Sequence, residues 1–280
     1  MRTWLITGCA TGFGALLAQT LLDRGEQVVA SDRSLDALAH LRAPHPERLL
    51  ATQLDVTEVA QIEHAVATAV GRFGRIDVLV NNAGLGLGGP FEEVPLSRIR
   101  QLFEVNTIGT MAVTQAVLPQ LRAQGAGRII CLSSDSGLVG WPFQAVYGAT
   151  KHAVEGFAEA LAFEVAPFGV QVVLVEPCGF FATPLPAGAI AEAVGSLRTD
   201  SPYRPAVEAM LGEVQGRMGA AQDPLLVVEA ILAVADDPAP PLRRPVGAPE
   251  RVALLERRRE LPDEAFLALI RPRESRSLEP

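Results

Sequence analysis

The chain has 280 residues, of which 49% are hydrophobic, and this apolar content suffices for the core of a single globular domain, which we place at residues 1–270. A formal net charge of −8 argues against a nucleic-acid partner or a membrane partner, because both attract basic surfaces. Three scattered cysteines and four histidines without ligand spacing predict neither a disulfide framework nor a metal site. We see no leader pattern and no apolar run of the roughly 18 residues that a membrane span needs, so we expect a cytoplasmic protein.

Short apolar runs rich in Val, Ile and Leu alternate with longer helical patterns along most of the chain. The runs occupy residues 3–6, 27–31, 48–54, 76–80, 128–133, 170–176 and 243–247, and the helical patterns lie near 14–24, 58–70, 98–122, 147–166 and 225–235. The runs do not alternate with polar residues, which is typical of strands buried on both faces. The sequence therefore predicts an α/β fold, a doubly wound parallel sheet of about seven strands with helices on both faces.

Residues 184–222 interrupt this alternation between the last two predicted strands. They are rich in Ala, Gly and Pro and are too long for an ordinary connection. We predict a helical lid over the substrate, with a mobile loop as the alternative. Residues 271–280 are predicted to form a disordered tail.

A glycine-rich loop, TGCATGFG, follows the first predicted strand directly. Gly8, Gly12 and Gly14 have the spacing G-x-x-x-G-x-G, which lets a backbone turn tightly and approach a pyrophosphate at the start of a helix. Thr11 and Phe13 lie between these glycines and are expected to contact the same cofactor. A plain turn is the alternative, and the lack of a Gly-Lys-Ser/Thr triplet disfavours an NTPase.

Asp32 ends the second predicted strand, 24 residues beyond Gly8, and Arg33 follows it. An acidic side chain there is able to accept hydrogen bonds from the adenosine ribose hydroxyls, whereas an arginine suits the 2′-phosphate of NADP. Because the carboxylate would repel that phosphate, we predict NAD, with NADP as the alternative. The other interpretation of Asp32 is a cap of a helix that starts near Ser34.

The next two predicted strands end in further small or polar residues. Asp55 and Val56 are expected to flank the adenine, although Asp55 is equally suited to cap a helix. NNAG, residues 81–84, ends the fourth run, and Asn82, Ala83 and Gly84 leave room for a cofactor where bulky side chains would block it. An ordinary loop turn is the alternative.

Tyr147 and Lys151, in the stretch YGATK, lie four residues apart at the start of a predicted helix. On a helix they share one face, and a nearby ammonium favours the phenolate, so the pKa of Tyr147 is expected to fall toward neutrality. Tyr147 is thus a candidate general acid and base. Ser134 precedes it by 13 residues, and a returning loop would bring the serine hydroxyl beside the phenol, although a turn cap is its other role. Asn106 is a polar residue within an apolar helical pattern, and its amide needs hydrogen-bond partners if it is buried. A purely structural role for this amide would be to tie two backbone segments together.

These motifs together, in their order and spacing, resemble the short-chain dehydrogenase/reductase family of the non-extended kind over residues 3–183. The resemblance implies a Rossmann-type fold, a nicotinamide dinucleotide and a catalytic tetrad. It implies that Tyr147 transfers a proton to or from the substrate oxygen, to which Ser134 also hydrogen-bonds. Lys151 would hold the nicotinamide ribose and lower the tyrosine pKa, and Asn106 would anchor a water molecule. NNAGLGLGGPFEEV and VVLVEP are reminiscent of the branch with 17-beta-hydroxysteroid and retinol dehydrogenases.

The segment after the sixth predicted strand departs from the family pattern. Pro177 is followed by Cys178, which displaces Gly179 and Thr183 by one position. Pro177, Gly179 and Thr183 are expected near the nicotinamide, with the threonine contact left open. Cys178 is either a reactive thiol or a packing residue.

Apolar side chains in the loops beside these motifs indicate a hydrophobic substrate, although such residues also commonly close a core. Those expected to line the substrate cleft are Leu85, Leu87, Trp141, Phe143, Phe180, Phe181 and Leu185. The family resemblance implies a homodimer or homotetramer, formed through the helices that carry Asn106 and Tyr147. A stripe of Ala153, Phe157 and Leu161 would face the partner or, alternatively, pack on the sheet.

The function that these expectations favour is an NAD(P)-dependent oxidoreductase that interconverts a secondary alcohol and a ketone or aldehyde on a hydrophobic substrate. The alternative is a catalytically silent protein that senses the dinucleotide. A sugar-nucleotide epimerase of the extended family is disfavoured, because its loop typically has the spacing G-x-x-G-x-x-G.

Overall fold

The computed structural model describes residues 1–41, 46–180, 185, 189, 192–195, 197–218 and 222–270, without the side chains of residues 213–218. Within these ranges it contains one parallel sheet of seven strands in the order β3-β2-β1-β4-β5-β6-β7. The strands are β1 Thr3–Thr7, β2 Gln27–Asp32, β3 Leu49–Gln53, β4 Val78–Asn81, β5 Gly127–Leu132, β6 Val170–Cys178 and β7 Arg243–Gly247. The predicted doubly wound parallel sheet is confirmed, because the chain order reverses between β1 and β4.

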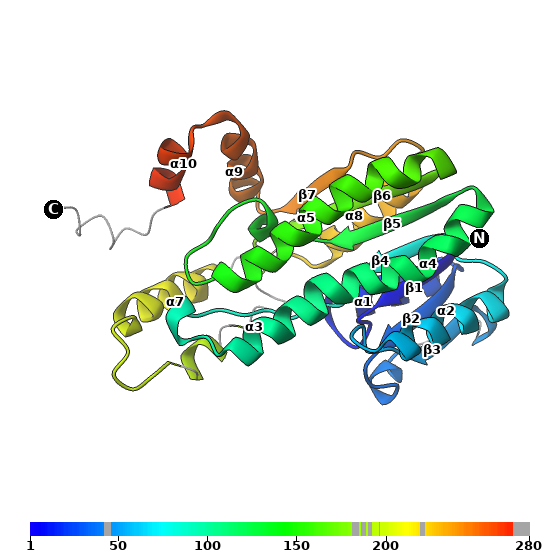
Figure 1. Cartoon of the computed structure of the whole chain (residues 1–280), viewed down its shortest axis with the longest axis horizontal. Helices are drawn as coiled ribbons and strands as arrows, with labels where there is room; N and C mark the ends of the chain where they lie inside the picture. Colours follow the sequence, from blue (N-terminus) through cyan, green and yellow to red (C-terminus); the bar gives the residue numbers. More distant parts are fainter. Residues whose placement is uncertain are drawn as a thin grey trace.

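Helices cover both faces of the sheet (Figure 1). They are α1 Gly12–Asp23, α2 Val59–Phe73, α3 Leu96–Phe103, α4 Thr110–Gln124, α5 Ala145–Val165, α7 Arg204–Met218, α8 Leu225–Asp236, α9 Pro249–Glu260 and α10 Asp263–Ile270. On one face Ile6 packs with Leu17 of α1 and Ile231 of α8. On the other face, residues of α2, α4 and α5 pack on neighbouring strand positions such as Leu5 and Val29. Successive strand residues point to opposite faces, so a strand covered on both sides is apolar at every position.

The long helix predicted at residues 98–122 is interrupted. A π-helical segment, Glu104–Gly109, separates α3 from α4 and contains Asn106. Gly109 lies so close to Val56 that a Cβ atom there would be 2.6 Å from a methyl carbon of the valine. Hydrophobic periodicity does not distinguish a π turn from an α turn, so the sequence alone did not predict this interruption.

The apolar stripe on α5 lies mainly against the sheet. Leu161 is buried in the same core cluster as Val154 and Ala158, and Phe157 packs at its edge. This placement agrees with the alternative interpretation of the stripe and removes Leu161 from any surface open to a partner.

The two helices after β7 were not among the predicted elements. Leu255 of α9 and Phe266 of α10 form a small buried cluster with Val139 and Cys178. In Figure 1 these helices gather with α3 and α7 at the end of the sheet where the strands finish. They bring C-terminal residues next to the loop that precedes α5.

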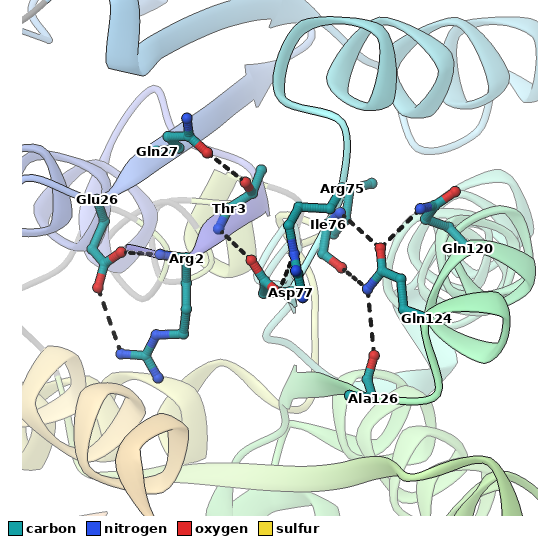
Figure 2. A network of polar contacts seen from close by, with 10 residues as sticks. All are labelled: Arg2, Thr3, Glu26, Gln27, Arg75, Ile76, Asp77, Gln120, Gln124 and Ala126. Atoms are coloured by element: carbon teal, nitrogen blue, oxygen red, sulfur yellow. Dashed lines mark hydrogen bonds and ion pairs between the residues drawn. The ribbon is translucent and has the colours of Figure 1, made fainter.

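A polar network holds the opposite, amino-terminal end of the sheet together (Figure 2). Asp77 accepts hydrogen bonds from the backbone N–H of Thr3 at 2.8 Å and from Arg75 Nε at 2.8 Å. Gln124, at the end of α4, donates to the carbonyl oxygen of Ile76 at 2.7 Å. These contacts fix where β1 and β4 begin and leave the carboxyl ends of the strands open for a site.

The residues that the structure describes contain neither a candidate membrane span nor a candidate metal site. None of their helices is long and apolar enough to cross a membrane. Their His, Cys, Asp and Glu side chains form no group of three or more with the arrangement of a metal site.

Candidate active site

A cavity of about 600 Å³ lies at the carboxyl ends of the strands. It brings together most residues that the sequence singled out. The predicted residues in its lining are Gly8, Thr11, Gly12, Phe13, Asp32, Arg33, Asp55, Val56, Asn82, Ala83, Gly84, Leu85, Leu87, Ser134, Phe143, Tyr147, Lys151, Pro177, Gly179, Phe180 and Leu185. Clustering at this edge follows from the topology, because parallel strands end on the same side.

The remaining predicted residues either do not line the cavity or lie outside the residues that the structure describes. Gly14, Asn106 and Trp141 do not line the cavity. Phe181 and Thr183 lie outside the described residues, as do residues 271–280. The described part of residues 184–222 includes α7, and Leu185, Glu192 and Met210 from this part reach the cavity.

The glycines of the loop after β1 are required by close contacts. Gly8 has a φ of +74°, and a Cβ atom there would lie 2.9 Å from the Cα of Ala83. A Cβ on Gly14 would lie 2.3 Å from the carbonyl oxygen of Gly8. Asn82 Nδ2 donates to the carbonyl oxygens of Thr7 and Gly8 at 2.8 and 2.9 Å, which joins the loops after β1 and β4.

The start of α1 suits a phosphate. Gly12 has a φ of +62° and lines the cavity, and a Cβ there would meet no protein atom within 4 Å. Thr11 precedes the helix without a side-chain cap hydrogen bond. The first turn of α1 therefore keeps backbone N–H groups that a pyrophosphate oxygen is able to use as donors.

Asp32 holds the glycine-rich loop in place. Its carboxylate accepts hydrogen bonds from the backbone N–H groups of Ala10 at 2.9 Å and of Arg33 at 2.8 Å. The helical turn that follows begins only at Asp36, with Leu35 before it, so Asp32 is not its cap. The half-buried carboxylate lines the cavity, where a ribose is able to reach it.

Asp55 forms a local turn before α2. Its Oδ1 accepts from the backbone N–H and the hydroxyl of Thr57 at 3.0 and 2.8 Å. The turn supports the capping alternative in part, since it leads into α2 without making Asp55 the cap residue. Both Asp55 and Val56 nevertheless line the cavity.

Ser134 begins a tight turn, residues 134–137, which we call the serine turn. Its hydroxyl accepts from the backbone N–H of Ser136 at 3.2 Å and donates to Asp135 Oδ1 at 3.0 Å. Burial raises the pKa of Tyr147 whereas Ser134 lowers it, so the serine and tyrosine side chains are close enough to interact. The predicted approach of the serine hydroxyl to the phenol is therefore present in the structure.

Lys151 lies beside Tyr147 on α5 but does not bond to its hydroxyl. Its Nζ donates to the carbonyl oxygen of Leu132 at 2.7 Å and is 5.9 Å from the centre of the tyrosine ring. Burial lowers the pKa of Lys151 to about 8, against the opposing influence of Cys131 and Glu155. A large fraction of the Lys151 side chain is thus the neutral amine at mildly alkaline pH.

The pKa of Tyr147 differs from the expectation. Burial raises it to about 12, the hydrogen bond to Ser134 lowers it, and the negative charge of Asp135 raises it further. The loss of solvation of a phenolate is the largest of these influences, and the charge of Lys151 is not among them.

Asn106 ties two segments together with its amide. Its Nδ2 donates to the carbonyl oxygen of Leu85 at 2.9 Å and to Thr150 Oγ1 at 3.1 Å. Its Oδ1 accepts from the backbone N–H of Leu85 at 2.7 Å. The fully buried amide therefore fixes the loop after β4 against α5, as one of the two sequence interpretations held.

The unusual Cys178 is a packing residue. Its side chain is completely buried, its Sγ–H donates to the carbonyl oxygen of Glu176 at 3.2 Å, and burial raises its pKa to about 12. A thiol with so high a pKa carries little thiolate at neutral pH. Gly179 follows it with a φ of +78° and lines the cavity.

Sequence reasoning missed several charged residues at the cavity. Arg98 of α3 makes two contacts of 2.5 Å with the carboxylate of Glu192, and both residues line the cavity. Arg251 of α9 also lines it and forms an ion pair with Asp135. The partners are 94 and 116 residues apart in the chain, so no local pattern relates them.

Comparison with known proteins agrees with the family that the sequence motifs resemble. The family model described as short chain dehydrogenase matches residues 2–192. The chain is 37% identical to the uncharacterized oxidoreductase YusZ of Bacillus subtilis over 90% of this chain and 91% of that protein. It is also 37% identical to 17-beta-hydroxysteroid dehydrogenase type 1 of Mus musculus, over 85% of this chain and 72% of that protein.

Solved structures extend the likeness to cofactor complexes. A short-chain dehydrogenase from Streptomyces avermitilis has a TM-score of 0.81 at 34% identity, with 99% of this chain and 98% of that chain covered. A 3-ketoacyl-(acyl-carrier-protein) reductase from Brucella melitensis, in complex with NADH, has a TM-score of 0.63 at 31% identity over 66% and 78%. A closed serine dehydrogenase in complex with NADP+ has 0.74 at 26% identity over 87% and 94%.

Proposed function

The chain belongs to the short-chain dehydrogenase/reductase family and is an NAD(P)-dependent oxidoreductase, and from this premise we propose that it interconverts a secondary alcohol and a ketone or aldehyde on a hydrophobic substrate. The observation that carries the proposal is the meeting of Ser134, Tyr147 and Lys151 at one cavity with the glycine-rich loop. A proton-transferring phenol, a hydrogen-bonding hydroxyl and a dinucleotide cradle are the parts that this chemistry needs.

The described residues fit a dinucleotide. The uncapped start of α1 suits its pyrophosphate, Asp32 its adenosine ribose, and Lys151 its nicotinamide ribose. When bound, the nicotinamide donates or accepts the hydride. The chain supplies the remaining steps, which are binding, orientation and proton transfer.

Tyr147 is proposed to transfer the proton. In reduction its O–H gives a proton to the carbonyl oxygen, and in oxidation its phenolate takes the proton of the alcohol. Ser134 hydrogen-bonds the same oxygen and holds it at the phenol. Because the pKa of Tyr147 is about 12 in the chain alone, the oxidation step depends on further positive charge at the site, which the cofactor and Lys151 together would provide.

The substrate end of the cavity is proposed to be apolar. Phe143, Phe180, Leu185 and Met210 line it, and Phe180 packs edge-on against Phe13 with ring centres 5.5 Å apart. Trp141 is left out of this proposal, because it packs beside the C-terminal helices instead. Phe143 has a φ of +60°, a conformation that is rare for a bulky residue and clusters at functional sites.

NAD is proposed as the preferred cofactor. Asp32 lines the cavity at the end of β2, and its charge would repel the 2′-phosphate of an NADP molecule whose adenosine ribose bound beside it. Arg33, which also lines the cavity, is the residue that favours NADP.

A substrate screen with both cofactors tests the proposal. We expect 2-octanol, 1-phenylethanol and cyclohexanol, or their ketones, to be turned over faster than sorbitol, glycerol or serine, because the wall is apolar. Preference for the polar compounds would overturn the hydrophobic assignment. Binding of dinucleotide without turnover of any compound would instead favour the silent sensor.

A further inference from the structure

Asp135 and Arg251 form an ion pair at the edge of the cavity. Arg251 Nη1 contacts Asp135 Oδ2, and the two side chains are only 16% and 4% exposed. The guanidinium carbon also lies 4.2 Å from the centre of the Trp141 ring. The pair connects α9, near the C-terminus, with the serine turn.

The second carboxylate oxygen of Asp135 engages the proposed catalytic serine. Its Oδ1 accepts the Ser134 hydroxyl at 3.0 Å and the Ser136 hydroxyl at 3.4 Å. Asp135 therefore bridges Arg251 and Ser134, with one oxygen toward each. The start of α9 is fixed by a 2.9 Å hydrogen bond from the Ala248 N–H to the carbonyl oxygen of Cys178, so Arg251 is held in register with β6.

A hydroxyl group has only one proton to donate. While Ser134 donates it to Asp135, the serine is able only to accept from Tyr147 or from a substrate. To donate to the substrate oxygen, Ser134 has to turn away from Asp135. A carboxylate without a counter-charge would hold the hydroxyl more strongly, since hydrogen bonds to an ionised acceptor are about twice as strong as neutral ones.

We propose that Arg251 and Asp135 are positioning residues for the reaction: Arg251 neutralises Asp135, so that Ser134 is free to turn to the substrate oxygen and Tyr147 does not face an unpaired negative charge. This inference rests on the proposed function of Tyr147. Neither residue transfers a proton itself. Both act through Ser134 and Tyr147.

Other charged side chains of the described residues lie on the elements packed against Tyr147. Lys151 lies on its own helix, and Arg98 of α3 is paired with Glu192 of residues 184–222. The remaining α3 contact is apolar, through Leu102 and its neighbours. Besides burial, the negative charge of Asp135 raises the pKa of Tyr147. This agrees with an influence of the Asp135–Arg251 ion pair on that pKa.

Three variants test the proposal: Arg251→Gln, Asp135→Asn and the double variant. The readout is the pH profile of kcat/KM for oxidation of 2-octanol or 1-phenylethanol, whichever is oxidised faster. Oxidation requires deprotonated Tyr147, so its rate rises with pH through the tyrosine pKa. Arg251→Gln leaves Asp135 unpaired and moves this limb about one unit higher, whereas Asp135→Asn moves it about one unit lower. The double variant is expected near the wild type.

Arg258→Gln is the matched control. Arg258 lies on the same helix, pairs with Asp263 at 2.8 Å and stacks on Phe266 at 5.2 Å, but it does not line the cavity. Its loss should leave the pH limb in place. A general weakening of α9 would lower all rates and the melting temperature without opposite shifts of the two single variants.

A second readout needs no turnover. The chain has two tyrosines, so in a Tyr203→Phe background the tyrosinate absorbance of the cofactor-free protein reports Tyr147 alone. Adding Asp135→Asn should lower the titration midpoint by about one unit. This arm decides the matter if Arg251→Gln does not fold or if no alcohol is oxidised.

An unmoved limb and an unmoved tyrosinate midpoint in Asp135→Asn would overturn the inference. The proposed function would survive that result if Tyr147→Phe were still inactive. A fully active Tyr147→Phe would remove the proposed function instead, whatever the ion-pair variants do.

Discussion

Lys151 is the only lysine in the chain, and all 23 other residues counted among the 24 lysines and arginines are arginines. An arginine keeps its charge at any accessible pH, whereas a buried lysine changes its pKa readily. Apart from the four histidines, the one side chain with a titratable cation is therefore the one beside Tyr147. Its buried ammonium, held by the carbonyl oxygen of Leu132, suits a group that binds a ribose and adjusts the charge at the phenol.

A single lysine allows its titration to be measured directly. In protein labelled with carbon-13 lysine, we expect one side-chain signal with a midpoint of about 8 in the absence of cofactor, because burial disfavours the ammonium. Lys151→Met removes the signal and, on the proposed function, weakens both dinucleotide binding and turnover. A midpoint at the ordinary lysine value of 10.5 would show that the ammonium is solvated.

Asp32 has two roles that substitution is able to separate. Asp32→Asn keeps an oxygen acceptor for the Ala10 N–H but removes the charge that would repel a 2′-phosphate. We expect the ratio of kcat/KM for NADP to that for NAD to rise in Asp32→Asn, and more in Asp32→Ser if the loop tolerates it. Arg33→Ala should change the ratio in the opposite direction. If neither substitution moves the ratio, Asp32 only supports the loop.

Helix α5 is joined to the edge of the sheet by a cluster of charges. Arg243 of β7 donates to Glu155 at 2.9 Å and to Glu159 at 2.5 Å, and its Nε lies 3.7 Å from Glu176. The carboxylate of Glu176 is completely buried, and neither of its oxygens has a hydrogen-bond partner among the described residues. Burial, reinforced by the charge of Glu155, raises the pKa of Glu176 to about 8.

This raised pKa makes the stability of the fold depend on pH. Between the ordinary value of 4.5 and about 8 the folded chain holds a proton that the unfolded chain releases. The contribution of Glu176 is thus fully present below pH 4.5 and is lost as the pH rises through 8. Glu176→Gln cannot lose a proton, so its melting temperature relative to wild type should rise between pH 5 and pH 9.

Glu159→Gln is the control for that comparison, because Glu159 contacts the same arginine and its side chain is 52% exposed. It should show no such trend. A constant difference between Glu176→Gln and wild type across the pH range would mean that Glu176 is ionised in the folded chain.

The helices, strands and loops that a local sequence pattern determines could be predicted from the sequence. Buried strands such as β1 and β6 are continuous apolar runs, and the glycine-rich loop has a local spacing. Other features depend on contacts that no local pattern carries. The π-helical segment at Asn106 and the pairing of Asp135 with Arg251, 116 residues apart, are of this kind. Trp141 was assigned to the cleft as an apolar residue in the loop before Tyr147, yet it packs against the cluster that includes Leu255 of α9 and Phe266 of α10.

Loops that follow strands in both halves of the sheet surround one cavity. The loops after β1, β2 and β4 supply the proposed dinucleotide contacts, and the segments after β5 and β6 supply the serine turn and the apolar wall. The described part of residues 184–222 is attached by the Arg98–Glu192 pair and by the hydrogen bond from Tyr203 to Glu92, at 2.6 Å. The opposite end of the sheet is closed by the network of Figure 2.

A homodimer or homotetramer through α4 and α5 stays a prediction. Phe163 of α5 is 79% exposed, and a large apolar side chain so open is typical of an interface. We expect sedimentation at micromolar concentration to show an oligomer that Phe163→Glu dissociates, because a buried charge would then lack a partner. Leu267→Glu, which alters a 55% exposed residue of α10, is the control and should leave the assembly intact. A monomeric wild type would contradict the prediction.

The central claim is that Tyr147 transfers the proton, and Tyr147→Phe tests it most directly. The substitution removes one hydroxyl and keeps the ring, so dinucleotide affinity should stay near the wild-type value. Tyr203→Phe, which alters the only other tyrosine, is the matched control; Tyr203 does not line the cavity, so this variant should keep far more activity than Tyr147→Phe. We predict that kcat/KM of Tyr147→Phe falls by about 10²–10⁴-fold with either cofactor, the usual loss on removing a general acid or base. A Tyr147→Phe protein that keeps most of its turnover, while binding the dinucleotide as the wild type does, would contradict the account.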